Sequence, residues 1–159
     1  MQTKVLSLKA LLEKLLPLRE KGDRIVFTYG WFDIVPVWHV RSLSAARADG
    51  DLLILGLNSD RSVATIKGPQ RPIVPEDQRA EVLAGLWCID FITLFDEPDP
   101  FNLIRALRPD VLVKGDDWPE DQIIGADIVK AGCGKVVRVP LAQGSSTTLI
   151  IEQIIKNYT

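Results

Sequence analysis

Residues 28–40 have the residue types and the spacing of a phosphate-binding turn. A short apolar run, 24–27, precedes a glycine at position 30, and an expected helix follows. This order of strand, turn and helix N-terminus is where α/β proteins hold phosphate groups, because the free backbone N–H groups of the first helical turn point at the ligand. His39, the single histidine of the chain, falls in that first turn. The segment therefore predicts a nucleotide-binding site.

Apolar runs that suit buried strands recur along the chain and alternate with helical stretches. The expected strands are 24–28, 52–57, 88–95, 111–114 and 135–139. The expected helices are 7–21, 37–48, 75–86, 100–107, 123–131 and 147–157, with Pro17 kinking or ending the first of them. This alternation predicts an α/β fold, a Rossmann-like, doubly wound, five-stranded parallel sheet covered by helices on both faces. Because no repeat or linker interrupts it, residues 1–159 are expected to form a single domain.

The overall composition excludes several classes of function. The chain has 159 residues, of which 47% are hydrophobic and 25% charged, and its net charge of −2 gives no reason to expect nucleic acid or an anionic membrane as a partner. No apolar run approaches the roughly 18 residues of a membrane span, and the N-terminus lacks a signal-peptide pattern, so the expected location is the cytoplasm. Cys88 and Cys133 are expected to be reduced thiols, and with one histidine no metal site is expected.

The segment 28–40 resembles the signature of the HxGH nucleotidyltransferases, in which G-x-F-D-x-x-H-x-G-H lies between a strand and a helix. The matching positions are Gly30, Phe32, Asp33 and His39. Further blocks follow in the family's order at 57–60, 67–73, 79–83, 108–118, 125–129 and 146–148. Over residues 5–157 the chain resembles the bacterial sugar-phosphate adenylyltransferases of the heptose pathway, with kinship to the glycerol-phosphate cytidylyltransferases.

This resemblance implies a reaction and a set of site residues. A sugar-phosphate oxygen would attack the α-phosphate of ATP or CTP, pyrophosphate would leave, and Mg²⁺ would bind the phosphates. His39 would be the remaining catalytic histidine. The implied nucleotide-binding residues are Thr28, Gly30, Phe32, Asp33, Lys114, Asp116, Asp117, Ser146, Thr147 and Thr148, and the implied phosphate loop contributes Lys67 and Arg71.

Several positions depart from the family pattern, mostly toward aromatic or less polar side chains. Pro36 stands at the first histidine of the motif and Trp38 at its glycine. The other departures are Tyr29 for an asparagine, Trp31 for a small residue, Ala64 for a basic residue and Ser145 for an arginine. Removing one preorganised donor to transition-state charge typically lowers the rate about 10²–10³-fold, and proline has no donor at all. Fast nucleotidyl transfer is therefore not expected.

Three functional hypotheses follow from these departures. The first is a nucleotidyltransferase-like scaffold, natural or engineered, with a disabled active site and a protein-binding surface made of Tyr29, Trp31, Pro36 and Trp38. The second is a site that still binds ATP or CTP with weak or no catalysis, the two tryptophans stacking on a base beside His39. The third is self-association through the same aromatic residues. The loss of phosphate-binding groups and the gain of aromatic area favour the first.

Overall fold

The computed structural model describes residues 2–140 and 146–159. Across these residues five parallel strands form one sheet in the order β3-β2-β1-β4-β5. The strands are β1 (Ile25–Gly30), β2 (Leu52–Asn58), β3 (Phe91–Phe95), β4 (Val111–Gly115) and β5 (Lys135–Val139). The predicted five-stranded parallel sheet is confirmed, and each predicted strand contributes to it.

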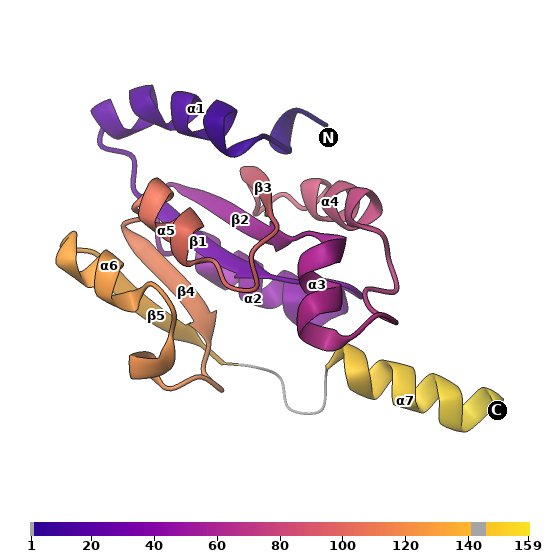
Figure 1. Ribbon diagram of the computed structural model, residues 1–159. Coiled ribbons are helices and arrows are strands. Elements are labelled where there is room, and N and C mark those ends of the chain that lie inside the picture. Colours follow the sequence, from indigo (N-terminus) through magenta and orange to yellow (C-terminus); the bar gives the residue numbers. More distant parts are fainter. Residues whose placement is uncertain (1, 141–145) are drawn as a thin grey trace.

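Helices cover both faces of the sheet (Figure 1). They are α1 (Leu8–Glu20), α2 (Val37–Arg47), α3 (Asp60–Lys67), α4 (Glu76–Ala84), α5 (Phe101–Leu107), α6 (Ala126–Ala131) and α7 (Thr147–Tyr158), with 3-10 turns at Gln2–Lys4 and Glu120–Gln122. Side chains of α2 and α4 pack on one face, and those of α1, α5 and α6 pack on the other. The doubly wound arrangement is therefore confirmed. Helix α7 extends away from the sheet, and none of its residues is buried.

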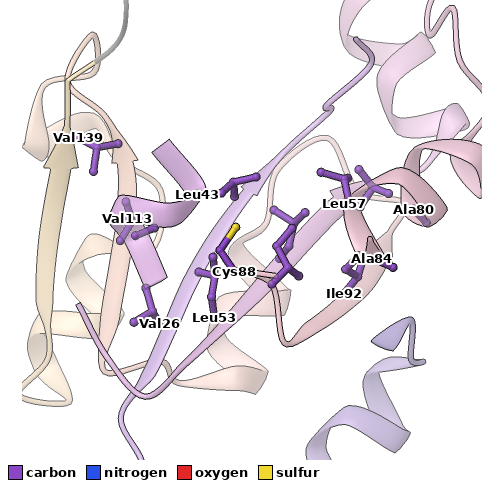
Figure 2. Packing of buried hydrophobic residues seen from close by; sticks show 14 of the residues in the cluster. Val26, Leu43, Leu53, Leu57, Ala80, Ala84, Cys88, Ile92, Val113 and Val139 are labelled. Atoms are coloured by element: carbon purple, nitrogen blue, oxygen red, sulfur yellow. The ribbon is translucent and has the colours of Figure 1, made fainter. Parts of the chain in front are cut away.

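Each strand feeds two hydrophobic clusters because successive side chains point to opposite faces of the sheet. In β1, Val26 joins the cluster under α2 and α4, whereas Ile25 and Phe27 join the cluster under α1, α5 and α6. Figure 2 shows the first cluster, in which Leu53 of β2 and Leu43 of α2 lie close to Val26. Burial on both faces explains why these strands are continuous apolar runs rather than alternating ones.

The structure differs from the expected elements at a few boundaries. Helix α1 runs through Pro17 to Glu20 instead of ending at the proline. Helix α3 was not expected, although Ser59 caps it by accepting a hydrogen bond from the Ser62 backbone N–H at 3.2 Å. Helix α6 begins only after Gly125, which has a φ of +85°. A side chain at this position would also clash with the core, because a Cβ there would lie 2.5 Å from Ile104. The strand and helix order is unaffected by these shifts.

The central strand β1 lies between β2 and β4, and the strand order reverses between β1 and β4. The Thr28 hydroxyl of β1 donates to the Val113 carbonyl of β4 at 3.0 Å, near the carboxyl ends of both strands. In open α/β sheets, ligands bind in the crevice outside the carboxyl ends at such a switch point. The fold therefore places the 28–40 segment where a small-molecule site is expected.

None of the helices in the described part of the chain has the length and apolar character needed to cross a membrane.

Candidate functional site

A pocket of about 810 Å³ lies at the carboxyl ends of β1 and β4. Its walls also include the first turns of α2 and α7 and the 98–100 loop before α5. The predicted site residues that line it are Thr28, Tyr29, Gly30, Trp31, Phe32, Asp33, Trp38, His39, Arg71, Lys114, Asp117, Ser146, Thr147 and Thr148. Pro36, Lys67 and Asp116 do not line this pocket. Residues from four distant segments of the sequence thus meet at one cavity.

The turn after β1 is tightly folded around an aromatic ring. A Cβ at Gly30 would lie 2.9 Å from the Phe32 ring, so a side chain there would force the turn to shift. Phe32 itself has a φ of +46°, in the left-handed region that bulky residues rarely adopt. Its ring lies 4.9 Å from the His39 ring, measured between centroids. The turn therefore brings Phe32 under the first turn of α2, where it supports His39.

Asp33 is buried and organises the loop between α3 and α4. Its carboxylate accepts hydrogen bonds from the backbone N–H groups of Ile73 and Val74 at 2.8–3.0 Å and from Arg71 Nε at 2.8 Å. Burial alone would raise the pKa of Asp33, but these backbone donors and the Arg71 guanidinium outweigh it and lower the pKa below its usual value. Asp33 therefore positions the Arg71 side chain at the pocket wall. The negative charge of Asp33 is balanced by the Arg71 guanidinium.

His39 lies in an aromatic setting that keeps it neutral. The Trp38 ring is 3.7 Å from the His39 ring between centroids. Burial lowers the pKa of His39 to about 4, against an opposing effect of the Ile34 backbone. Among the described residues, neither His39 Nδ1 nor Trp38 Nε1 has a hydrogen-bond partner, although both atoms are buried. In the protein without a ligand the imidazole is therefore uncharged at neutral pH.

Pro36 and Trp38, the two positions at which the sequence was expected to depart from the family pattern, lie at the N-terminus of α2. Pro36 is the N-cap residue and makes no side-chain capping hydrogen bond. Trp38 lines the pocket. Tyr29, Trp31 and Trp38 are all half-buried in the pocket rather than exposed. The expected aromatic residues are thus part of a concave wall.

Lys114, at the end of β4, points its ammonium group at aromatic rings. Its Nζ lies 3.9 Å from the Tyr29 ring centroid and 6.0 Å from that of Trp118. Burial lowers the pKa of Lys114 to about 8, and the nearby Asp117 carboxylate partly offsets this shift. Burial also raises the pKa of Tyr29 to about 12, with a further contribution from Asp99. The Tyr29 phenol is therefore neutral while part of Lys114 loses its proton near pH 8.

A second lysine contacts an aromatic residue from outside the pocket. Lys67 Nζ lies 4.3 Å from the Trp31 ring centroid, and the lysine itself is exposed. Such a contact over an indole face is worth about 0.5–1 kcal/mol at an exposed site. Lys67 therefore contacts the outer face of Trp31, and the Lys67 side chain does not line the pocket.

The start of α7 supplies hydroxyl groups and free backbone donors. The Ser146 hydroxyl accepts a hydrogen bond from the Leu149 backbone N–H at 3.1 Å, which makes Ser146 the N-cap residue. Thr147 and Thr148 line the pocket beside it. Ser145, the expected replacement for an arginine, lies outside the described residues.

Arg79 of α4 is the buried residue that sequence reasoning left without a function. Its guanidinium donates to the carbonyls of Trp31, Asn58 and Val74 at 2.6–2.9 Å and pairs with Asp60 at 2.7 Å. A buried arginine needs this many partners to offset its desolvation. In the sequence Arg79 follows Glu76, Asp77 and Gln78, and this polar local pattern does not indicate burial. Arg79 joins the ends of β1 and β2 to α4 and so shapes one side of the pocket.

The described residues contain no cluster of three or more histidine, cysteine, aspartate or glutamate side chains that could hold a metal ion. Asp99 and Asp117 are the two carboxylates other than Asp33 that line the pocket. Magnesium sites of nucleotide enzymes commonly use one or two carboxylates together with substrate phosphates. These residues alone therefore do not form a protein-made metal cage.

Comparisons with known proteins agree with this geometry. A model of the cytidylyltransferase-like family matches residues 27–153. The bifunctional protein HldE of Trichlorobacter lovleyi is 46% identical over 157 residues, which are 99% of this chain and 32% of that protein. The HldE of Pseudomonas entomophila is 50% identical over 153 residues, 96% of this chain and 32% of that protein. The chain thus spans about a third of the length of these curated relatives.

Solved structures show the same architecture. The lipopolysaccharide core biosynthesis protein of Thermoplasma volcanium has a TM-score of 0.62 and 25% identity, covering 76% of this chain and 98% of that protein. Pantoate-beta-alanine ligase of Francisella tularensis has a TM-score of 0.60 at 14% identity, covering 87% of this chain and 67% of that protein, and supports the fold alone. Three observations indicate the same family: the sequence match over residues 27–153, the reversed strand order at β1 and β4, and the pocket at the ends of these strands. The chain belongs to the cytidylyltransferase-like family.

Proposed function

We propose that this chain binds a nucleotide, ATP or CTP, in the pocket at the ends of β1 and β4. The observation that carries the proposal is that Tyr29, Trp31 and Trp38 line a cavity of about 810 Å³ instead of forming an exposed surface. Ligand pockets of about 300–1,000 Å³ with mostly apolar walls and a few polar groups are typical of small-molecule sites. Stacking on an aromatic side chain contributes about 1–3 kcal/mol per base. The wall therefore suits a nucleobase.

Polar groups at one end of the pocket suit the phosphates. The first turn of α7 offers backbone N–H groups together with the hydroxyls of Thr147 and Thr148. Lys114 supplies a cationic amine when it is protonated. Arg71 lines the same cavity, but its Nε is already bonded to Asp33. These groups support phosphate binding of moderate strength.

The family reaction, transfer of a nucleotide to a sugar phosphate, is proposed to be slow or absent in this chain. Pro36 has no donor, and the neutral His39 offers at most a weak one. Losing one preorganised donor typically costs about 10²–10³ in rate, and the Trp38 indole takes up space beside the phosphate-binding turn. We infer weak turnover for a sugar phosphate of the heptose or glycerol type. Mg²⁺ would enter the pocket bound to the triphosphate.

Nucleotide titration tests the proposal directly. The tryptophans at 31, 38 and 118 line the pocket, so their fluorescence should change as ATP or CTP saturates the site. Trp38→Ala and Trp31→Ala should change the affinity, whereas Trp87→Ala should not, because Trp87 is 75% exposed and lies outside the pocket. No saturable binding of either nucleotide at millimolar concentration would refute the proposal.

Pyrophosphate release tests the weak turnover separately. Protein with ATP or CTP, Mg²⁺ and heptose or glycerol phosphates should release little pyrophosphate, and turnover near a typical enzyme rate of about 10 s⁻¹ would contradict this. The combined change Pro36→His, Trp38→Gly and Ser145→Arg should raise the rate, since it restores the lost donors.

Binding of a protein partner, or of a second copy, through Tyr29, Trp31, Pro36 and Trp38 stays a prediction. The half-buried positions of the three aromatic residues favour a small ligand over a broad protein interface. A sizing experiment on the chain and on Trp31→Ala decides it. A hot-spot residue should lose at least about 2 kcal/mol of binding on truncation.

A further inference from the structure

Lys114 and Lys67 are the lysines whose described contacts are with aromatic rings, and of the two only Lys114 lies in the pocket wall, since Lys67 is exposed. Lys4 donates to a backbone carbonyl, and Lys130 and Lys135 pair with carboxylates. Among the described residues, Lys114 Nζ makes neither a hydrogen bond nor an ion pair, and its contacts are with the rings of Tyr29 and Trp118. The amine therefore lies in the pocket wall with no carboxylate bound to it.

We propose that Lys114 is an amine nucleophile that forms an imine with planar aromatic aldehydes entering the pocket. This activity goes beyond nucleotide binding. It uses the same amine that the proposed function assigns to the phosphates, and its test contains no nucleotide, so the two proposals fail separately. Three observations carry it: the unbonded amine, the aromatic walls around it, and a cavity large enough for a bicyclic ring. A lysine desolvated in an apolar pocket is one of the known ways to activate an amine toward carbonyl compounds.

The groups around Lys114 leave it partly unprotonated near neutral pH. Burial lowers its pKa to about 8, so about a quarter of the amine is free at pH 7.5, against about 0.1% for an ordinary lysine. The gain in free amine is about 200-fold. Asp117 works against this shift, and Tyr29, with a pKa of about 12, stays neutral and adds no charge. The other charged groups of the pocket are Asp99, Arg71 with its partner Asp33, and the neutral His39.

The proposed step needs no oxidant, reductant or metal. The Nζ lone pair attacks the carbonyl carbon, a C–N bond forms, and the carbonyl π pair moves to oxygen, which takes up a proton to give a carbinolamine. The nitrogen then gives up one proton to water. The carbinolamine hydroxyl takes up a second proton from water and leaves as a water molecule while the nitrogen lone pair forms the C=N bond, and the resulting iminium gives its last nitrogen proton to water. The net reaction is amine plus aldehyde to imine plus water.

The walls of the pocket select for flat aldehydes. Tyr29 and Trp118 flank the amine, and the Trp38 and Phe32 rings lie further along the same cavity. Rings that stack gain about 0.5–1.5 kcal/mol beyond their buried area. An aromatic aldehyde should therefore reach Lys114 more readily than a small aliphatic aldehyde of similar reactivity.

The test is reductive trapping at pH 7.5 with 6-methoxy-2-naphthaldehyde and sodium cyanoborohydride, read by intact mass and peptide mapping. This probe carries no phosphate, so binding of phosphate groups cannot produce the result. We expect the predominant lysine adduct to form on Lys114, at least about tenfold faster than on Lys67. Peptide mapping counts the α-amino group separately, because its ordinary pKa is also near 8. Lys67 is the matched comparison because it also lies over an aromatic ring but is exposed. Equal labelling of the two lysines would overturn the proposal.

Variants separate the amine from the fold. Lys114→Arg keeps the positive charge and should abolish the predominant adduct, and Lys114→Met should do the same if the arginine disturbs folding. Lys67→Arg should leave labelling at Lys114 unchanged. Thermal unfolding of each variant checks that the fold is intact. An adduct of unchanged yield in folded Lys114→Met, or equally selective labelling of Lys114 by propanal, would contradict the amine assignment or the aromatic preference respectively.

Discussion

The polar groups on the two sides of the pocket differ in whether they are hydrogen-bonded. On the side formed by the 71–74 loop and α4, the Asp33 carboxylate accepts hydrogen bonds from backbone N–H groups and from Arg71. The Arg79 guanidinium on the same side donates to backbone carbonyls. On the side formed by α2 and the end of β4, Trp38 Nε1, His39 Nδ1 and the Lys114 amine have no hydrogen-bond partner among the described residues.

This contrast separates groups that are fully paired within the fold from groups that are not. A buried polar atom left without a partner costs about 1–3 kcal/mol, so folded proteins keep few of them. Trp38 Nε1 and His39 Nδ1 are two such atoms, and their residues line the pocket. On the bonded side, Asp33 and Arg79 are engaged within the protein and fix the shape of the pocket, while Arg71 bonds Asp33 through its Nε and also lines the cavity.

Breaking the bonded side should have the largest effect on stability. Arg79→Leu removes a buried guanidinium and leaves the carbonyls of Trp31, Asn58 and Val74 without their donor. We expect the free energy of unfolding in urea to fall by about 4 kcal/mol. The control is Arg61→Leu, because Arg61 forms an exposed ion pair with Asp96 and should change stability by less than about 1 kcal/mol. A similar loss in both variants would show that burial of Arg79 does not matter.

Protonation of His39 should have an intermediate effect on stability. The unfolded chain binds this proton near pH 6.5, whereas the folded chain binds it only near pH 4. Protonation therefore favours the unfolded chain, and the free energy of unfolding should fall as the pH drops from 6.5 to 4. After a discount for partial exposure of the ring, we expect a loss of about 2 kcal/mol.

The matched variant for this pH effect is His39→Gln, whose stability should change much less over the same range in urea unfolding. Asp33 does not interfere, because its pKa lies below 3.8 and its contribution is lost only at more acid pH. An equally steep loss in His39→Gln would assign the effect to another group.

Removing the Tyr29 hydroxyl should have the smallest effect. Tyr29→Phe keeps the ring under the Lys114 amine and deletes only a neutral phenol group. We expect unfolding free energy to change by no more than about 0.5 kcal/mol. The pH midpoint of Lys114 labelling should stay near 8, because burial and not the phenol causes the lowered pKa. A shift of that midpoint back toward 10.5 would show that the hydroxyl contributes.

Much of the site was predictable because its residues belong to ordered blocks at the ends of strands. The predicted nucleotide-binding residues that line the cavity are Thr28, Gly30, Phe32, Asp33, Lys114, Asp117, Ser146, Thr147 and Thr148. Asp116 and Lys67 were also predicted for the site but do not line the cavity, and Lys67 ends α3 with its amine over the outer face of Trp31. The exposure of the aromatic residues was not predictable either, since the walls around them come from α3, α7 and the 98–100 loop.

The sequence by itself determined the order of strands and helices and the parallel sheet, because buried strands must be apolar on both faces and the intervening helices must cover them. It also determined that Pro36 and Trp38 stand in the turn after β1, which is the basis for expecting weak catalysis. Only the tertiary structure decided that Arg79 is a buried anchor, that His39 is neutral and that Lys114 has a lowered pKa. Those properties depend on desolvation and on partners far away in the sequence, which local patterns do not contain.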